Sequence, residues 1–117
     1  MDGPYPPRCG QADVPEPEPL SQERLAEIAK ALAHPARIKI LEQFLECRPH
    51  IAREIVAEFD LAQSTVSEHL RLLRQADLLT ATRDGPRTWY CIRRAVLHQF
   101  AEAIDDLSAA SALVDVG

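Results

Sequence analysis

Residues 60–92 read DLAQSTVSEHLRLLRQADLLTATRDGPRTWYCI, and the first half of this stretch predicts an amphipathic helix. Over residues 63–76 the apolar side chains Val66, Leu70 and Leu73 recur every three or four positions, which is the spacing of one buried helix face. The positions between them are mostly polar and are free to face outward. Such a helix packs one side on a core and presents the other to solvent or to a partner.

The second half of the stretch predicts a β-hairpin. Residues 78–83 and 87–93 read as strands, and Asp84-Gly85 between them is a typical hairpin turn pair. A polar-faced helix followed at once by a hairpin is the order of elements in a winged helix-turn-helix. In that fold the helix fits the major groove of DNA, and the hairpin, or wing, reaches neighbouring phosphates or the minor groove.

The rest of the chain predicts further helices on both sides of this stretch. Ser21 is a suitable N-cap for a helix that His34-Pro35 ends, and Pro35 then suits the first turn of a second helix. The remaining expected boundaries are an end of that second helix near residue 47, a third helix over residues 51–59 and a last helix over residues 94–113. The predicted fold is therefore mainly α with a small β-hairpin wing.

The chain divides into an arm and one folded domain. Residues 1–20 hold six of the nine prolines, with one basic and four acidic residues, so we expect a flexible, solvated, Pro-rich acidic arm. Residues 21–113 are expected to form a winged-helix domain for DNA binding and dimerisation, because so small a core gains from a partner subunit. The apolar spacing of Leu97, Phe100 and Ile104 in the last helix suits pairing with a second copy.

The formal net charge of −5 does not exclude a nucleic-acid partner, because the acidic residues lie toward the ends of the chain. Residues 67–94 carry six arginines against three acidic residues, whereas residues 95–117 carry four acidic residues and no Lys or Arg. Salt limits the reach of a charge to ~8 Å under physiological conditions, so the local positive charge decides phosphate attraction.

The predicted reading helix and wing supply the candidate DNA-contacting residues. Gln63 can pair with adenine, and hydroxyl groups can reach bases or phosphates. Arg83 and Arg87 flank the hairpin tip, where guanidinium groups meet phosphates or the minor groove. The full candidate set is Gln63, Ser64, Thr65, Ser67, His69, Arg71, Arg83 and Arg87. The alternative is that this polar surface is merely solvated.

Three blocks of the sequence, in this order, resemble the ArsR/SmtB family of bacterial winged-helix repressors. They are ALAHPARIKIL at residues 31–41, LAQSTVSEHLRLLRQADLL at residues 61–79 and RDGPRTWYCI at residues 83–92. The resemblance implies a homodimer formed through the first and last helices, which binds an imperfect palindrome in double-stranded promoter DNA. It also implies release of that DNA when an effector, often a metal or metalloid ion, binds.

Two positions depart from the family pattern. Ala62 stands where many members place Ser or Thr to cap the reading helix, and a missing cap costs ~1 kcal/mol. Glu68 places an acid on the face offered to DNA. There it either accepts a hydrogen bond from a cytosine amino group or is a solvated edge residue, and both roles fit the sequence.

The sequence contains two sets of candidate metal ligands. The family's Cys-Val-Cys motif is absent, but Cys9 and Cys47 lie roughly where some members bind trivalent arsenic. As(III) or Sb(III) prefers three sulfurs, so Cys91 or another donor would have to complete that set. Reduced thiols fit three sparse cysteines better than a disulfide framework, and a redox role or inert cysteines are the alternatives. The second set is His98, Glu102 and Asp105 on one face of the last helix, which a solvated acidic surface explains more simply than a metal site does.

Other classes of function receive less support. A winged helix that docks a protein partner without reading DNA is the main alternative, but the arginines of the reading helix and wing argue against it. There is no phosphate-binding Gly-rich loop, catalytic carboxylate pair or nucleophile motif, so we expect no enzyme. No apolar run approaches the ~20 residues of a membrane span, and the first residues lack the pattern of a secretion signal, so a cytoplasmic protein without a membrane partner is expected.

Overall fold

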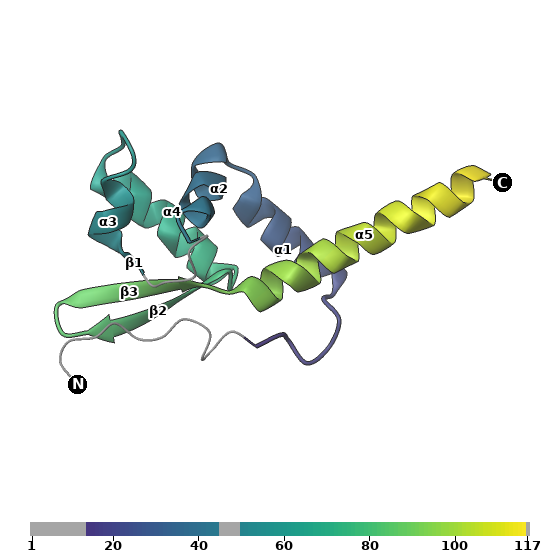
Figure 1. The fold of residues 1–117 in the computed structure, drawn as a ribbon, viewed down its shortest axis with the longest axis horizontal. Helices are drawn as coiled ribbons and strands as arrows, with labels where there is room; N and C mark the ends of the chain where they lie inside the picture. The colour runs from purple at the N-terminus through teal and green to yellow at the C-terminus, as the bar shows by residue number, and fades with distance from the viewer. Residues whose placement is uncertain (1–13, 45–49, 117) are drawn as a thin grey trace.

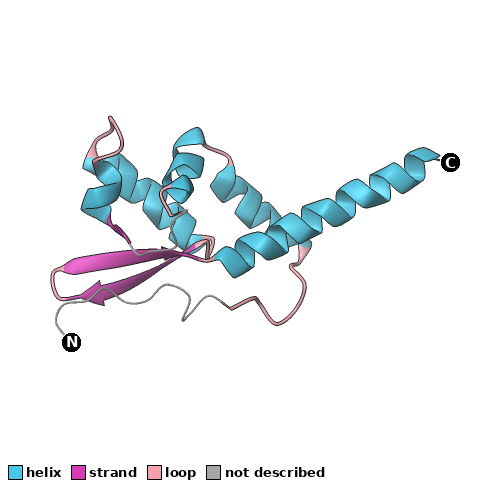
Figure 2. Cartoon of the chain, viewed as in Figure 1, coloured by secondary structure: helices cyan, strands magenta, loops and turns pink. Residues whose placement is uncertain are grey.

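The computed structural model describes residues 14–44 and 50–116, with residues 110–116 described by their backbone alone. Within these residues, helices gather on a small sheet and the last helix projects from the body (Figure 1 and Figure 2). The elements, in chain order, are α1 (Gln22–Leu32), α2 (Pro35–Glu42), β1 (His50–Ile51), α3 (Ala52–Val56), α4 (Gln63–Gln75), β2 (Leu79–Asp84), β3 (Arg87–Ile92) and α5 (Arg94–Val116). The expected fold class, mainly helical with a hairpin wing, is confirmed.

Side-chain caps set the starts of the first two helices. Ser21 caps α1 as the sequence predicts, because its hydroxyl accepts a hydrogen bond from the Arg24 amide at 3.1 Å. His34 caps α2 in the same way, since its Nδ1 accepts from the Ala36 amide at 3.1 Å. Pro35 occupies the first turn of α2, where a missing N–H costs no hydrogen bond.

One hydrophobic core holds the helices against the sheet. The inner face of α4 is buried as its spacing predicts, with Val66, Leu70 and Leu73 at most 1% exposed. Phe44 is fully buried, and its ring meets the ring of His50 edge-on with the centroids 4.8 Å apart. The other fully buried side chains are those of Ile28, Ile40, Ile55, Leu78, Leu79 and Val96. These contacts fix α4 in the body of the protein.

The hairpin pairs as the sequence predicts, and a third strand joins it. β2 and β3 are antiparallel, with Asp84 opposite Arg87 beside the turn. Gly85 takes the positive φ of 63° that this tight turn requires. β1 pairs antiparallel with the other edge of β3, which gives the strand order β1-β3-β2. The sequence pattern does not predict this short third strand.

Two helices are shorter than the sequence pattern predicts. The helix expected over residues 51–59 is wrong at both ends, because His50 and Ile51 extend and pair with β3 and because α3 contains only five residues. β-pairing satisfies the backbone groups that a longer helix would otherwise have used. α2 ends at Glu42, before the expected boundary, and Cys47 lies outside the described residues.

Residues 14–20 are tied to the folded domain, although the sequence predicts a freely solvated arm there. The Glu16 amide donates to Gln99 Oε1 on α5 at 3.0 Å, and Gln99 Nε2 donates to the Glu16 carbonyl at 3.1 Å. The Glu16 carboxylate also pairs with Arg24 of α1 at 2.8 Å. These contacts hold the end of the arm against two helices; residues 1–13 lie outside the described part of the chain.

α5 extends well beyond the core. Its first turns pack against the body, where Val96 is buried and where Leu97 and Phe100 are partly buried. Farther along, Ile104 is 45% exposed and Leu107 is 60% exposed. The projecting helix gives the molecule a long dimension of 60 Å, against 33 and 23 Å in the other two directions (Figure 1). No helix of the described residues is long and apolar enough to cross a membrane.

Candidate nucleic-acid interface

The outer face of α4 presents polar side chains to solvent. Packing of Val66, Leu70 and Leu73 into the core turns this face outward, because residues three and four apart share one side of a helix. The exposed candidate residues of α4 are Gln63, Ser64, Thr65, Ser67 and Arg71. The structure therefore leaves all but one of the candidate residues of this helix accessible to a partner.

His69 is the exception, and the prediction that it faces outward is wrong. Its side chain is only 8% exposed, and its ring centroid lies 4.6 Å from that of His34. His69 Nδ1 accepts a hydrogen bond from Arg37 Nε at 3.3 Å. Burial lowers the pKa of His69 most, positive charge on His34 and Arg37 lowers it further, and Glu68 opposes the shift. His69 lies at the edge of the buried face, where an imidazole meets both apolar groups and a polar partner.

Glu68 and Arg71 form an exposed ion pair on the outer face of α4. Arg71 donates from Nε to Oε1 at 2.9 Å and from Nη2 to Oε2 at 2.6 Å, so both carboxylate oxygens of Glu68 are engaged. The hydrogen bonds from Arg71 lower the pKa of Glu68, and Glu68 in turn raises the pKa of Arg71. Glu68 and Arg71 are three positions apart, a spacing at which oppositely charged side chains on a helix can pair. The sequence could therefore have indicated this pair, but Arg71 was expected to contact the DNA backbone instead.

α4 begins without a side-chain cap. Ala62 holds the N-cap position with an extended backbone, at φ −63° and ψ 147°, and offers no acceptor to the first turn. The Thr65 amide donates to the Ala62 carbonyl at 3.0 Å, so the N–H groups left to water or to a ligand are those of Gln63 and Ser64. Since such groups attract phosphate, this departure from the family pattern opens the start of the helix to an anion while weakening its cap.

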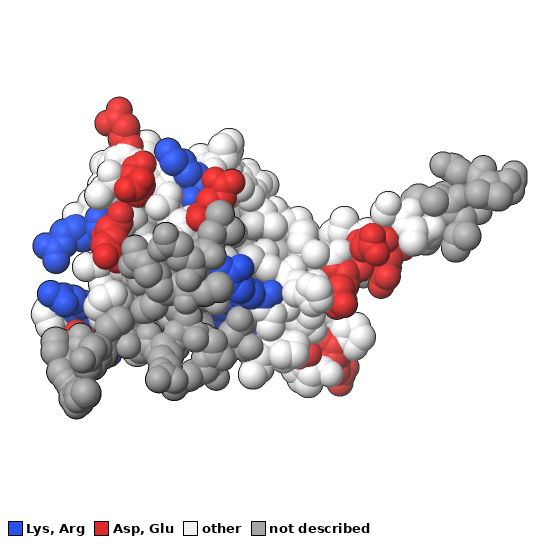
Figure 3. Space-filling model, in the orientation of Figure 1, with Lys and Arg blue, Asp and Glu red and all other residues white. Residues whose placement is uncertain are grey.

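The wing carries two exposed arginines at its tip. Arg83 is the next-to-last residue of β2, and Arg87 begins β3 on the other side of the turn. Neither forms an ion pair with any residue in the described ranges, so both guanidinium groups are available to a partner. Figure 3 shows both basic and acidic side chains at the end of the molecule that carries the wing, and acidic ones along the projecting part of α5.

The candidate metal ligands are dispersed or fall outside the described residues. Cys9 and Cys47 lie outside them. Cys91 is 8% exposed and disulfide-bonded, so it is not the reduced thiol that the sequence predicts. On α5, His98 lies 3.5 Å from Glu102, and both side chains are exposed. Within the part of the chain that the structure describes, no three His, Cys, Asp or Glu side chains are placed to hold a metal ion.

Comparisons with known proteins agree with this geometry. The family model described as "Bacterial regulatory protein, arsR family" matches residues 34–81. Rv0081 of Mycobacterium tuberculosis, an HTH-type transcriptional regulator, is 40% identical over 77 residues, which cover 66% of this chain and 67% of that protein. Its crystal structure matches with a TM-score of 0.57 at 39% identity, over 84% of this chain and 96% of that one.

Two further relatives bear on control and assembly. The arsenical resistance operon repressor of Staphylococcus aureus is 27% identical over 92 residues, which cover 79% of this chain and 88% of that protein. The solution structure of the homodimeric winged helix-turn-helix DNA-binding domain of Mb0332 from Mycobacterium bovis matches with a TM-score of 0.60 at 27% identity, over 78% of this chain and 82% of that one. The chain therefore belongs to the ArsR family of bacterial transcriptional regulators, whose winged helix-turn-helix DNA-binding fold it shares.

Proposed function

We propose that this protein is a homodimeric repressor that binds palindromic promoter DNA through α4 and the wing. The observation that carries the proposal is the exposed polar face of α4 beside a hairpin whose two tip arginines have no partner in the described residues. A helix in the major groove and a hairpin on the flanking backbone would engage DNA together. The protein then acts as a regulator and not as an enzyme, in keeping with the names of its relatives, and we expect it in the bacterial cytoplasm.

The side chains of the interface divide into base readers and phosphate contacts. Gln63, in the first turn of α4, can offer its amide oxygen and nitrogen to an adenine edge. Arg83 and Arg87 would meet phosphates or the minor groove beside that half-site. Arg71 would reach a phosphate only on leaving Glu68, which holds it in the free protein. Hydroxyl contacts to bases or phosphates would come from Ser64, Thr65 and Ser67.

The distribution of charge favours approach of DNA from the end that carries the wing. Glu102, Asp105 and Asp106 belong to α5. Figure 3 shows acidic side chains along the projecting part of this helix, away from the end that carries the wing. Because salt screens charges over ~8 Å, these acids do little to oppose phosphate attraction at the wing. A net charge of −5 is thus compatible with DNA binding at one end of the molecule.

The uncovered apolar side of α5 supports a homodimer. Ile104 and Leu107 continue the line that Leu97 and Phe100 begin, yet both are largely exposed to solvent. A second copy of the helix would remove these side chains from water at about 25 cal/mol for each Å² of apolar surface buried. The homodimeric state of the Mb0332 domain supports the same arrangement.

We further propose that an effector releases the protein from DNA, with a thiophilic ion such as As(III) or Sb(III) as the first class to test. The S. aureus relative is named as a repressor of an arsenical resistance operon. Cys9 and Cys47 would supply thiolates in the reduced protein, in which the disulfide of Cys91 is broken and Cys91 could join them. A redox signal at the same thiols, or a non-metal effector, is the alternative.

Replacing both wing arginines, Arg83→Ala with Arg87→Ala, should weaken binding to every DNA sequence. Each lost phosphate contact reduces counterion release, so the slope of log affinity against log salt should become shallower by about 0.9 per contact. Fluorescence anisotropy on DNA from the protein's own upstream region, at several salt concentrations, measures both effects. Lys30→Ala on α1 is the control for loss of one charge and should leave the slope unchanged. Full binding by the double variant would remove the wing from the interface.

Gln63→Ala should act differently, by relaxing base preference at one position of each half-site. A lost bidentate contact should reduce discrimination at that position by about 1–3 kcal/mol, with little change in salt dependence. Competition between cognate DNA and single-base variants measures this preference. Equal discrimination by Gln63→Ala and by the native protein would show that Gln63 reads no base. A native protein that binds no DNA at any salt concentration would instead favour the protein-docking alternative.

Leu107→Glu should convert dimers into monomers, because it places a charge within the apolar line of α5. Sedimentation equilibrium gives the mass directly, and affinity for a palindromic site should fall since the two half-sites would be bound independently. His98→Glu, at an exposed position on the opposite side of the helix, should remain dimeric. A dimeric Leu107→Glu protein would place the interface elsewhere.

In reducing buffer, arsenite or antimonite should release the native protein from promoter DNA. The affinity for DNA should fall by about 5- to 150-fold, the usual range of allosteric coupling. Cys9→Ser and Cys47→Ser should each abolish this release while leaving affinity without the ion intact. Zinc and an oxidant provide the comparison for a different metal and for a redox signal. Release that persists in both serine variants would exclude these thiols as the sensor.

A further inference from the structure

Arg37 joins the end of α1 to the middle of α4 through three hydrogen bonds. Its Nη1 donates to the carbonyl oxygens of Lys30 and Ala31, each at 3.1 Å. Its Nε donates to His69 Nδ1 at 3.3 Å. The two carbonyls belong to the last turn of α1, and the Lys30 carbonyl also accepts from the Ala33 amide at 3.2 Å. The guanidinium plane of Arg37 is thereby held by groups on two different helices.

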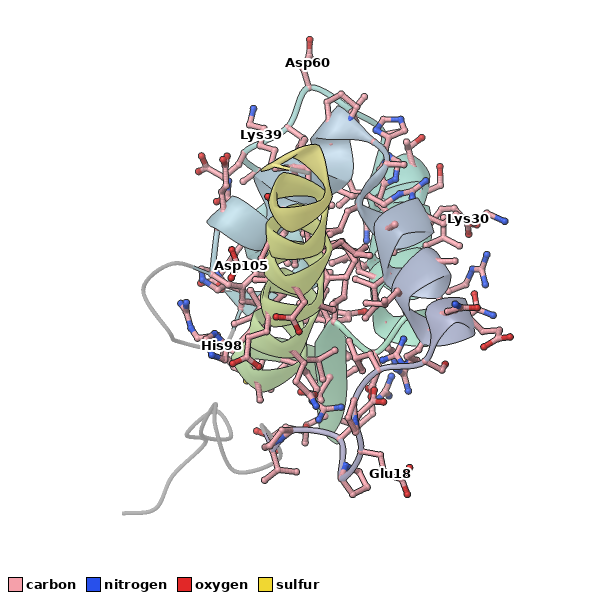
Figure 4. The ribbon with its side chains drawn as sticks, turned by 90° about the vertical axis from the view of Figure 1, so that its right-hand side faces the viewer. Glu18, Lys30, Lys39, Asp60, His98 and Asp105 are labelled. Atoms are coloured by element: carbon pink, nitrogen blue, oxygen red, sulfur yellow. The ribbon has the colours of Figure 1, made fainter. Side chains whose placement is uncertain are left out.

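The same guanidinium keeps one edge open toward solvent. No residue in the described ranges accepts a hydrogen bond from Arg37 Nη2. Arg37 is half-buried and borders a hollow of about 470 Å³ between α1 and α4. Lys30, which lines the same hollow, lies on the side of α1 away from α5 in Figure 4. The hollow thus opens on a side that the projecting helix does not cover.

Arg37 also lies beside the reading face of α4. Its positive charge contributes to the lowered pKa of Glu68, which is exposed on that face. His69, to which Arg37 is bonded, directly follows Glu68 in the helix. A guanidinium with a free N–H edge in this position suits a phosphate oxygen at the border of the major groove.

We propose that Arg37 contacts a DNA phosphate and that His69 is the positioning residue which orients its guanidinium. This inference rests on the proposed DNA binding through α4. It adds a role for the buried His69, which would support DNA binding through Arg37 without touching DNA itself. The neutral imidazole is required, since its Nδ1 must accept the hydrogen bond from Arg37 Nε. The proton of the neutral ring then resides on Nε2.

Protonation of His69 would undo this arrangement. A hydrogen on Nδ1 removes the acceptor and places a positive charge against Arg37 and against His34, whose ring centroid lies 4.6 Å away. The Nδ1 of His34 is itself an acceptor, since it bonds to the Ala36 amide as the cap of α2. The two histidines must therefore be separated in any test of pH.

The sign of the pH dependence follows from the groups around His69. They are His34 and Arg37 from α2, Glu68 from α4 itself, and Glu27 and Lys30 of α1 across the hollow beside Arg37. Burial foremost, then the charges of His34 and Arg37, lower the pKa of His69 from its ordinary 6.5. The neutral form that orients Arg37 is present above this pKa and is lost as the pH falls through it. The affinity that Arg37 adds should thus be full at neutral pH and lost in acid.

Substitutions at position 69 separate positioning from packing. His69→Leu fills the buried site without an acceptor, so it should bind promoter DNA roughly tenfold more weakly at neutral pH, with a salt slope shallower by about 0.9 per protomer. Arg37→Gln, which keeps a donor for the α1 carbonyls but no charge, should show the same losses. His69→Asn places an amide oxygen near the position of Nδ1 and cannot be protonated, so it should keep the native affinity at neutral pH.

The decisive comparison is a pH titration of DNA affinity in a His34→Asn background, where Asn preserves the cap of α2 without titrating. With His69 present, affinity should fall in acid relative to the His69→Asn protein. Superimposable pH profiles would overturn the proposal, as would native affinity and salt slope in Arg37→Gln. If His69→Leu does not fold, judged by circular dichroism, the His69→Asn comparison still decides. The Arg83→Ala with Arg87→Ala protein reports on DNA binding separately, so failure of the proposed function is distinguishable.

Discussion

Burial of the inner face of α4 is the constraint on which the rest of the structure depends. Val66, Leu70 and Leu73 are almost wholly removed from water, and burial of each contributes roughly 1.5–3 kcal/mol. The exposed Glu68 and Arg71 pair on the opposite face contributes far less, because water screens charges at the surface. Apolar packing therefore sets the rotation of the helix, and the direction in which Gln63 points is a consequence of that packing.

The carboxyl end of α4 is held by polar groups from three other parts of the chain. Asp77 takes a positive φ of 66° where the helix passes into β2, and its carboxylate pairs with Arg93 at 2.5 Å. Arg93 Nη2 also donates to the Val14 carbonyl at 2.6 Å, and Arg24 of α1 lies 3.9 Å from Asp77. The end of the arm, α1 and the residue before α5 thus share contacts with the turn that follows α4. A change in the spacing of α1 and α5 across a dimer would reach α4 through these few bonds.

The sequence could predict the elements whose own residues carry a strong period or turn signal. Val66, Leu70 and Leu73 define α4, and Asp84-Gly85 defines the hairpin, without reference to the rest of the chain. β1 could not be predicted, because two residues show no period and their pairing depends on β3. The hydrogen bonds between Glu16 and Gln99 join residues 83 positions apart, and no local pattern reports such a contact.

The residues of the candidate site also fall into those that the sequence could place and those that it could not. Exposure of Gln63, Ser64 and the wing arginines follows from the face of α4 and from the turn, so these residues could be placed in advance. The burial of His69 could not, because it lies at the edge of the apolar face, where a polar side chain is compatible with either environment. Its partner Arg37 is 32 positions away, and only the packing of α2 on α4 brings the two together.

Position 37 requires arginine, because its side chain must bond to both α1 and α4. Its planar fork bonds two carbonyls of α1 with one nitrogen and His69 with a second, while the third remains open. A lysine ammonium in the same place would carry the charge, but it could not hold a fixed plane between the two helices while directing a donor to a phosphate. Since α1 is also expected to contribute to the dimer, the same side chain would connect subunit spacing to a backbone contact on DNA. Rotation of α1 relative to α4 would then misdirect the open edge of Arg37, even if the reading face of α4 itself were unchanged.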